Sequence, residues 1–272
     1  MTPQEAEILE AQDIELIYDD GEPLESNWHR IQMNLLIDIV YQKMVQRGRS
    51  DFFVGGNMFI YFSFEQAKVI AANPPEGYRH FRGPDFFYVG GVDPKPERNA
   101  WVVWREEGRY PDVIIELLSA STSLVDKTTK KKLYERTFHT PEYFWYDPVG
   151  DELMGWRING GRYKAIEANE KGWLRSEELG MWLGRWHGVR VGQEALWLRF
   201  YDYEGALAPT PAEAERERAE AERQRAEAER ERAEAERQRA EAERERAEAE
   251  RQRADAAEAE LARLRTRLAE LE

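Results

Sequence analysis

The last part of the chain repeats a single heptad, and this repeat constrains the fold more than any other feature. Six consecutive copies of AEAERER or AEAERQR run from Ala212 to Arg253. Strong helix formers fill every position, and Glu and Arg recur at the spacing of helical neighbours, as in Glu220 and Arg223. Residues 212 to 272 therefore cannot build a globular core, and we expect a charged helix about 90 Å long.

The sequence leaves open whether this helix forms a coiled coil. When Leu261 and Leu268 are placed at position a, and Leu264 and Leu271 at position d, the earlier heptads carry Ala at a and Glu at d. A seam of glutamates does not hold two helices together, which favours a single solvated helix. The alternative is a homo-oligomer that the four leucines clamp at the end of the helix.

The aromatic residues lie in the other part of the chain, which we call the body because it precedes the charged helix. All 9 Trp, 12 Tyr and 11 Phe precede residue 204, which is ample for a hydrophobic core. This change in composition predicts a globular domain over residues 1–205, a linker over 206–211 that contains Pro209 and Pro211, and the charged helix over 212–272.

Composition also excludes several classes of protein. The formal net charge of -14 argues against a general basic coat for nucleic acid. The absence of cysteine excludes disulfide frameworks, thiolate metal sites and cysteine nucleophiles. The acidic N-terminal residues contain no apolar signal region, and no stretch of about 18 apolar residues occurs. We therefore expect a cytoplasmic protein that does not bind membranes.

The body alternates between helical and strand-like segments. Ser26 can cap a helix that ends near Gly48, and a second helix opens at Ser121 or Thr122 and ends near Phe138. Aromatic and β-branched residues predict strands in five segments, which are 51–64, 86–89, 101–104, 112–118 and a segment that starts at 142. This order predicts an α/β fold with a mixed β-sheet flanked by helices.

One charged residue interrupts the most apolar of these strands. The segment 111–119 reads PDVIIELLS, so Glu116 lies within a run expected to be buried on both faces. An ionised carboxylate there must be protonated, paired with a cation or bound to a metal. One alternative to a metal site is a structural ion pair between Glu116 and Lys130, a residue of the following helix.

Other charged residues are expected near this strand. Asp85 follows Pro84 at the start of a second apolar strand, where it either caps a turn or faces Glu116. On the helix that follows, Asp126, Lys130, Tyr134 and Phe138 lie four apart, so we expect Lys130 to face the sheet and Lys132 to face away. Tyr134 and the tryptophans are expected in the core, and the four histidines show no ligand spacing.

Taken together, these motifs resemble those of the Uma-type restriction endonuclease family of bacteria, a branch of the PD-(D/E)xK nuclease superfamily. The resemblance covers roughly residues 25–205. Its motifs are GPDFFYVGGV at 83–92, WVVWREEGRYPDVIIELLSAST at 101–122, DKTTKKKLY at 126–134 and PEYFWYDP at 141–148. It implies a restriction-endonuclease-like fold and Mg²⁺- or Mn²⁺-dependent hydrolysis of DNA phosphodiester bonds.

The resemblance also implies site residues. Asp85 would take the PD position and Glu116 the (D/E) position, and these two residues with the carbonyl of Leu117 would hold the metal. The superfamily lysine stands two residues after the acid, where this chain has Leu118. Lys130 on the following helix would replace it as the catalytic lysine, with Lys131 as second choice. Asp112 is a rival metal ligand.

The alternative function is a catalytically inactive nuclease fold that serves as an interaction module, with the charged helix as a spacer or assembly arm.

Overall fold

The structure is a computed structural model that describes residues 14, 16–18, 26–72, 83–94, 97–119 and 123–269. It divides into two compact units, Met1–Pro211 and Ala212–Glu272, which are described separately.

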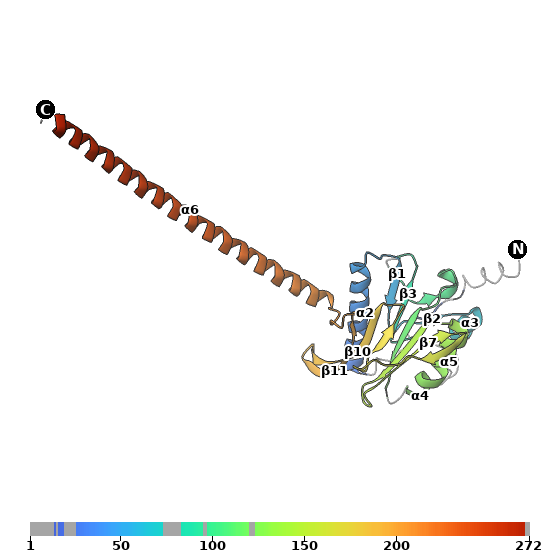
Figure 1. Cartoon of the computed structure of the whole chain (residues 1–272). Helices are drawn as coiled ribbons and strands as arrows, with labels where there is room; N and C mark the ends of the chain where they lie inside the picture. The colour runs from blue at the N-terminus through green and yellow to red at the C-terminus, as the bar shows by residue number, and fades with distance from the viewer. Residues whose placement is uncertain are drawn as a thin grey trace. The chain divides into compact units, whose positions relative to one another are not determined.

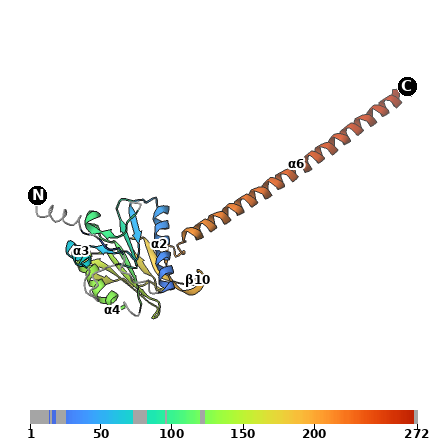
Figure 2. The ribbon, with the colours of Figure 1, turned by 180° about the vertical axis from the view of Figure 1, so that it is seen from behind.

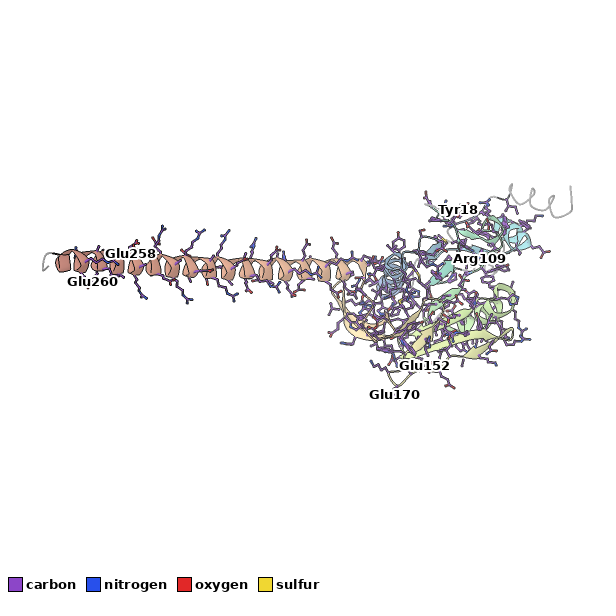
Figure 3. The ribbon with its side chains drawn as sticks, turned by 45° about the horizontal axis from the view of Figure 1, so that its top comes forward. Tyr18, Arg109, Glu152, Glu170, Glu258 and Glu260 are labelled. Atoms are coloured by element: carbon purple, nitrogen blue, oxygen red, sulfur yellow. The ribbon has the colours of Figure 1, made fainter. Side chains whose placement is uncertain are left out.

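The second unit consists of one helix. Helix α6 (Pro211–Ala269) runs without a break, and Pro211 occupies its first position, where proline needs no amide hydrogen. Its side chains, among them Glu258 and Glu260, project outward along the helix (Figure 3). Leu261 and Leu264 are each 54% exposed. The predicted long charged helix is thus confirmed, and association through its leucines stays a prediction.

The central element of the body is a six-stranded mixed sheet (Figure 1). Its strands, in spatial order, are β1 (Phe52–Gly55), β3 (Phe86–Gly90), β5 (Val113–Leu117), β6 (Glu142–Asp147), β7 (Glu152–Asn159) and β8 (Arg162–Ala165). Only β5 and β6 run parallel, and the other neighbours in this sheet are antiparallel. The predicted mixed sheet is therefore confirmed.

Two smaller sheets contain the remaining strands of the part of the body that the structure describes. An antiparallel sheet contains β9 (Leu174–Ser176), β10 (Met181–Arg190) and β11 (Gln193–Tyr201). A parallel pair contains β2 (Ile60–Tyr61) and β4 (Trp101–Val102), and a short 3-10 turn, η1 (Val103–Arg105), follows β4.

Helices cover both faces of the central sheet. Helix α2 (Asn27–Gln46) packs on one face, where it contacts β1 and β3 of the central sheet and β11 of the three-stranded sheet (Figure 2). The other face is covered by a helical run made of α4 (Ser123–Val125), η2 (Asp126–Lys130), α5 (Lys131–Leu133) and η3 (Tyr134–Phe138). The side chains of β5 divide between these layers, because Val113, Ile115 and Leu117 pack toward α2 and Ile114 packs toward the helical run.

Most predicted elements are present, and two segments differ. In the predicted strand 101–104, only Trp101–Val102 is a strand, and the 3-10 turn begins at Val103. Ser26 caps α2 as expected, because its hydroxyl accepts a hydrogen bond from the His29 amide at 3.1 Å. The segment 51–64 is not one strand, since it contains β1 and β2 and ends where helix α3 (Phe64–Ala71) begins. Ser63 caps α3 by accepting a hydrogen bond from the Gln66 amide at 3.1 Å. This Ser-x-x-Gln capping signal was present in the sequence.

The predicted starts of the second helix, Ser121 and Thr122, lie outside the described residues. The predicted linker packs against the body. The Ala208 amide donates to the Phe200 carbonyl at 2.9 Å, Arg199 donates to the Ala208 carbonyl at 2.9 Å, and Leu207 forms a β-bridge with Tyr201. Among the described residues, no helix combines the length and the apolar character that crossing a bilayer requires.

Candidate active site

Two acidic residues meet where strands β3 and β5 pair. Phe86 is paired with Ile115, so the same register brings Asp85 opposite Glu116. The amide of Leu117 donates to Asp85 Oδ2 at 2.7 Å, and the Asp85 amide makes a long contact of 3.5 Å with Glu116 Oε2. The sheet register thus fixes the two carboxylates next to each other, as the sequence predicted.

The helical run places a line of side chains over these carboxylates. Its segments η2 and η3 are π-helical. Residues four apart drift around an α-helix of about 3.6 residues per turn, whereas a π turn is wider because its hydrogen bonds span five residues. Alternation of the two types keeps Asp126, Lys130, Tyr134 and Phe138 on the face toward the sheet, where Asp126, Tyr134 and Phe138 are buried.

Glu116 has a partner at each carboxylate oxygen. Its side chain has no exposed surface. The hydroxyl of Tyr134 donates to Oε1 at 2.8 Å, and Nζ of Lys130 lies 3.1 Å from Oε2. The predicted inward orientation of Lys130 is therefore confirmed, and Tyr134 is a core residue whose hydroxyl also contacts the site.

Lys130 has a second and closer acidic partner. Its Nζ lies 2.7 Å from Asp126 Oδ1, and the side chain of Asp126 is only 1% exposed. The hydroxyl of Tyr143 on β6 donates to the Asp126 carbonyl at 2.9 Å, which ties the start of the π-helical segment to the sheet. Asp126 is thus a member of the site for which the sequence had predicted no role, although its spacing of four from Lys130 was visible.

The electrostatics of this group follow from burial. Burial raises the pKa of Glu116 to about 8, although the Lys130 charge lowers it, and the charges of Asp126 and Asp85 raise it further. Burial by itself would lower the pKa of Lys130, but the charges of Glu116, Asp126 and Asp85 outweigh burial and keep it above its ordinary value. The surrounding carboxylates therefore favour the protonated form of Lys130, and burial favours the protonated form of Glu116.

The rival ligand Asp112 lies at the other end of the strand pair. Asp112 Oδ2 accepts a hydrogen bond from the amide of Gly90 at 2.6 Å and lies 3.6 Å from Nη2 of Arg109. Gly90 is the last residue of β3, whereas Asp85 precedes the first. Arg109 marks the position of Asp112, and Glu152 marks the helical run, because Glu152 pairs with Lys127 of that run. Figure 3 shows Arg109 well separated from Glu152. The structure therefore does not bring Asp112 to the carboxylate pair.

The other lysines of the run point elsewhere. Nζ of Lys131, the second choice for the catalytic lysine, lies 3.6 Å from the ring centroid of Trp156. Nζ of Lys127 lies 4.4 Å from the ring centroid of Trp145 and 3.6 Å from Glu152 Oε2. Lys132 is exposed, as predicted. Lys130 is therefore the lysine of this run that contacts Glu116.

Leu118 occupies the position two residues after Glu116, where the superfamily pattern has a lysine. Its side chain is 2% exposed and belongs to the apolar cluster that contains Ile114 and Phe138. A lysine at this position would have to bury its charge among apolar side chains. Lys130 contacts the Glu116 carboxylate from the helical run that covers this face of the sheet.

His29, for which the sequence had predicted no role, contacts Asp85. His29 Nε2 lies 2.7 Å from Asp85 Oδ1, and the side chains of the two residues are 7% and 16% exposed. No spacing signal pointed to this residue, because α2 and β3 meet only in the folded chain.

The site offers oxygen ligands that suit a hard divalent cation. Among the residues that the structure describes, no group of three or more His, Cys, Asp or Glu side chains could hold a metal ion. Mg²⁺ usually takes only one or two protein carboxylates and completes its shell with waters and substrate oxygens. Asp85 and Glu116 fit that requirement. The N–H and C=O groups of a strand residue point to the same neighbour, so the Leu117 carbonyl is expected on the Asp85 side.

A family of known proteins matches more than half of the chain. The sequence model of a family described as "Uma2: Putative restriction endonuclease" matches residues 3–189. None of the curated proteins matches the chain. One similar solved structure is that of a putative nuclease belonging to DUF820 from Anabaena variabilis, which is 14% identical with a TM-score of 0.39. The match covers 60% of this chain and 81% of the solved chain.

Proposed function

Because the chain belongs to the Uma2 family of putative restriction endonucleases, we propose that its body is a metal-dependent DNA endonuclease. The reaction is hydrolysis of phosphodiester bonds, and the cofactor is Mg²⁺ or Mn²⁺. The residues proposed to carry it are Asp85, Glu116 and Lys130, with the Leu117 carbonyl as a further metal ligand.

One observation carries this proposal: a single lysine faces three buried or nearly buried carboxylates. Lys130 lies within ion-pair distance of Glu116 and Asp126, and Asp85 is close enough to raise the pKa of both Glu116 and Lys130. One ammonium group cannot balance three carboxylates, and buried charge without a partner is costly. In the metal-free protein the proton that Glu116 keeps offsets part of this negative charge, and a divalent cation would take the place of that proton.

Each side chain has a definite role in this scheme. Asp85 and Glu116 hold the cation between two adjacent strands. When bound, the cation would lower the pKa of a bound water and neutralise charge on the scissile phosphate. Lys130, a donor that stays protonated, hydrogen-bonds the attacking water or the phosphate oxygens as negative charge develops there. Asp126 holds the lysine through a second ion pair, with Oδ1 at 2.7 Å from Nζ.

Lysines on the helical run give this region local positive charge, which would favour the approach of a DNA phosphate backbone although the chain is acidic overall. Lys132 is exposed, and Lys127 is 35% exposed, on the same helical run that carries Lys130. Contacts of this kind provide affinity without sequence specificity and weaken as salt rises.

The proposal is tested with purified protein and three DNA substrates: supercoiled plasmid, linear duplex and single strands. We expect cleavage with Mg²⁺ or Mn²⁺, none in EDTA, and none with Glu116→Gln. Calorimetry with Mn²⁺ on the same two proteins measures metal binding independently of turnover. Tight Mn²⁺ binding by wild type without cleavage of any substrate, at any enzyme excess, would favour the inactive interaction module.

A further inference from the structure

The contact between His29 and Asp85 adds a residue to the proposed site. Nε2 of His29 is 2.7 Å from Asp85 Oδ1, and both side chains are largely buried. An ionised carboxylate can only accept hydrogen bonds, so Nε2 must carry the hydrogen in this pair. The imidazole is therefore a donor that the fold directs at one chosen oxygen of Asp85.

The position of His29 is fixed by the start of helix α2. Its own amide donates to the capping hydroxyl of Ser26 at 3.1 Å. One turn later, Gln32 is fully buried and exchanges two hydrogen bonds with Leu198 of β11, at 2.9 and 2.7 Å. The first turn of α2 contains no acidic residue that would compete with Asp85 for the imidazole of His29.

Asp85 is held at both oxygens by groups of different origin. Oδ1 accepts from His29, and Oδ2 accepts from the Leu117 amide at 2.7 Å. A carboxylate has about four acceptor positions, so each oxygen keeps one free for another partner. The two donors set the direction of those free positions. Without the imidazole, the carboxylate could rotate about its last bond, because the Leu117 amide would be the one donor left to hold this side chain among the described residues.

We propose that His29 is a positioning residue that fixes the Asp85 carboxylate in the orientation in which it holds a divalent cation beside Glu116. This inference rests on the proposed function, since it presumes that Asp85 is a metal ligand. It assigns α2, which covers the face of the sheet opposite the catalytic lysine, a direct part in the site.

The test measures Mn²⁺ affinity by calorimetry on the full chain, with folding checked by denaturant unfolding. His29→Leu removes the donor at similar size, and we expect affinity to fall about 10- to 100-fold, which is typical of outer-shell partners of metal ligands. His29→Gln can place its amide nitrogen near the position of Nε2, and we expect it to recover most of the affinity.

Two controls separate positioning from stability. Gln32→Met removes the buried hydrogen bonds of α2 to Leu198 without touching Asp85, and it should lower the free energy of unfolding but leave the Mn²⁺ affinity within about twofold of wild type. His187→Leu changes an exposed histidine on β10 and should change neither quantity. If His29→Leu does not fold, the comparison of His29→Gln with His29→Asn replaces it, because asparagine is too short to reach Asp85.

The outcomes are distinct for the two proposals. Absence of Mn²⁺ binding by wild type would contradict the proposed metal site itself. If wild type binds Mn²⁺ and the folded His29 variants bind it equally well, the positioning role is wrong and the proposed function stands. An equal loss of affinity in Gln32→Met would show that α2 acts through its docking and would also overturn the role assigned to His29.

Discussion

Nζ of Lys130 lies 3.1 Å from Oε2 of Glu116, a carboxylate with no exposed surface, and 2.7 Å from Oδ1 of Asp126. The lysine therefore bridges a strand and its own helical run. A buried pair of this kind costs desolvation of both charges, and removal of one partner leaves the other uncompensated. Substitutions in this bridge and in the groups around it should therefore have distinct effects on turnover, metal binding and stability.

Lys130→Ala should abolish DNA cleavage. It should weaken Mn²⁺ binding at pH 7, because the Lys130 charge lowers the pKa of Glu116, but by less than the loss of a ligand in Glu116→Gln. Loss of a donor that acts in the transition state lowers turnover by about a hundredfold or more, and lysine is not a metal ligand. The measurements are single-turnover cleavage and Mn²⁺ calorimetry. Lys132→Ala is the matched control on the exposed face, and it should reduce at most the DNA affinity, more at low salt than at high salt.

Lys131→Ala should retain turnover, because Nζ of Lys131 lies over the ring of Trp156. Loss of cleavage in Lys131→Ala together with normal cleavage in Lys130→Ala would reverse the assignment of the catalytic lysine.

Asp85→Asn and Glu116→Gln should each weaken Mn²⁺ binding strongly, whereas Asp112→Asn should have little effect. A metal ligand contributes more than an outer-shell partner, whose loss costs about 10- to 100-fold in affinity. Asp112 instead accepts a hydrogen bond from Gly90 at the far end of β3, so its substitution should lower the free energy of unfolding. Calorimetry and denaturant unfolding measure these two effects. Equal losses of affinity at Asp112 and Asp85 would require a different ligand assignment.

Mn²⁺ affinity should rise with pH up to about 8. A carboxylate must release its proton before it binds a cation, and burial raises the pKa of Glu116 from 4.5 to about 8. Below this value proton and metal compete, so affinity should rise by up to about tenfold per pH unit and then level off. Titrations of wild type between pH 6 and 9 test this, and a flat profile would show that Glu116 is already ionised at neutral pH.

The same shift predicts how the stability of the metal-free protein depends on pH. Between the ordinary pKa of 4.5 and the folded value of about 8, the folded state keeps a proton that the unfolded state has released. The free energy of unfolding should therefore fall as pH rises through this window. Glu116→Gln removes the ionisable group, so the fall should be smaller in this variant. Denaturant unfolding in EDTA at several pH values measures the difference, and identical slopes for both proteins would contradict the shift.

Tyr134→Phe should weaken both stability and metal binding. The tyrosine hydroxyl donates to Glu116 Oε1 and lowers the pKa of that carboxyl, so its loss leaves a buried oxygen short of a donor. We expect a cost of about 1–3 kcal/mol in free energy of unfolding and weaker Mn²⁺ binding at pH 7, with partial recovery at higher pH. Tyr163→Phe is the matched control, because its hydroxyl donates to the Thr140 carbonyl away from Glu116, and its Mn²⁺ affinity should equal that of wild type.

A peptide of residues 212–272 should be strongly helical at low salt and lose part of its helicity as salt rises. Each exposed ion pair adds only about 0.2–0.5 kcal/mol and is screened by salt. Circular dichroism measures the helicity, and light scattering measures association. A tight dimer that survives replacement of Leu261, Leu264, Leu268 and Leu271 by Ala would contradict the single solvated helix.

Local sequence determined much of this protein by itself. The Glu and Arg side chains of α6 pair with each other three or four residues apart, so this helix needs no tertiary contacts. Ser26 and the apolar spacing that follows it specify α2 in the same local way. Glu116 lies within a continuous apolar strand, so its carboxylate required a partner in any packing of that strand. The spacing of four residues between Lys130 and Tyr134 predicted that Lys130 faces the sheet.

The tertiary structure decided which groups meet across the chain. The register of β3 on β5 brings Asp85 opposite Glu116 and leaves Asp112 with Gly90, although both aspartates follow a proline in the sequence. The docking of α2 supplies His29, and the π-helical turns aim Asp126 at Lys130. These contacts join segments far apart in the chain or depend on how a helix packs, and local periodicity carries no information about either.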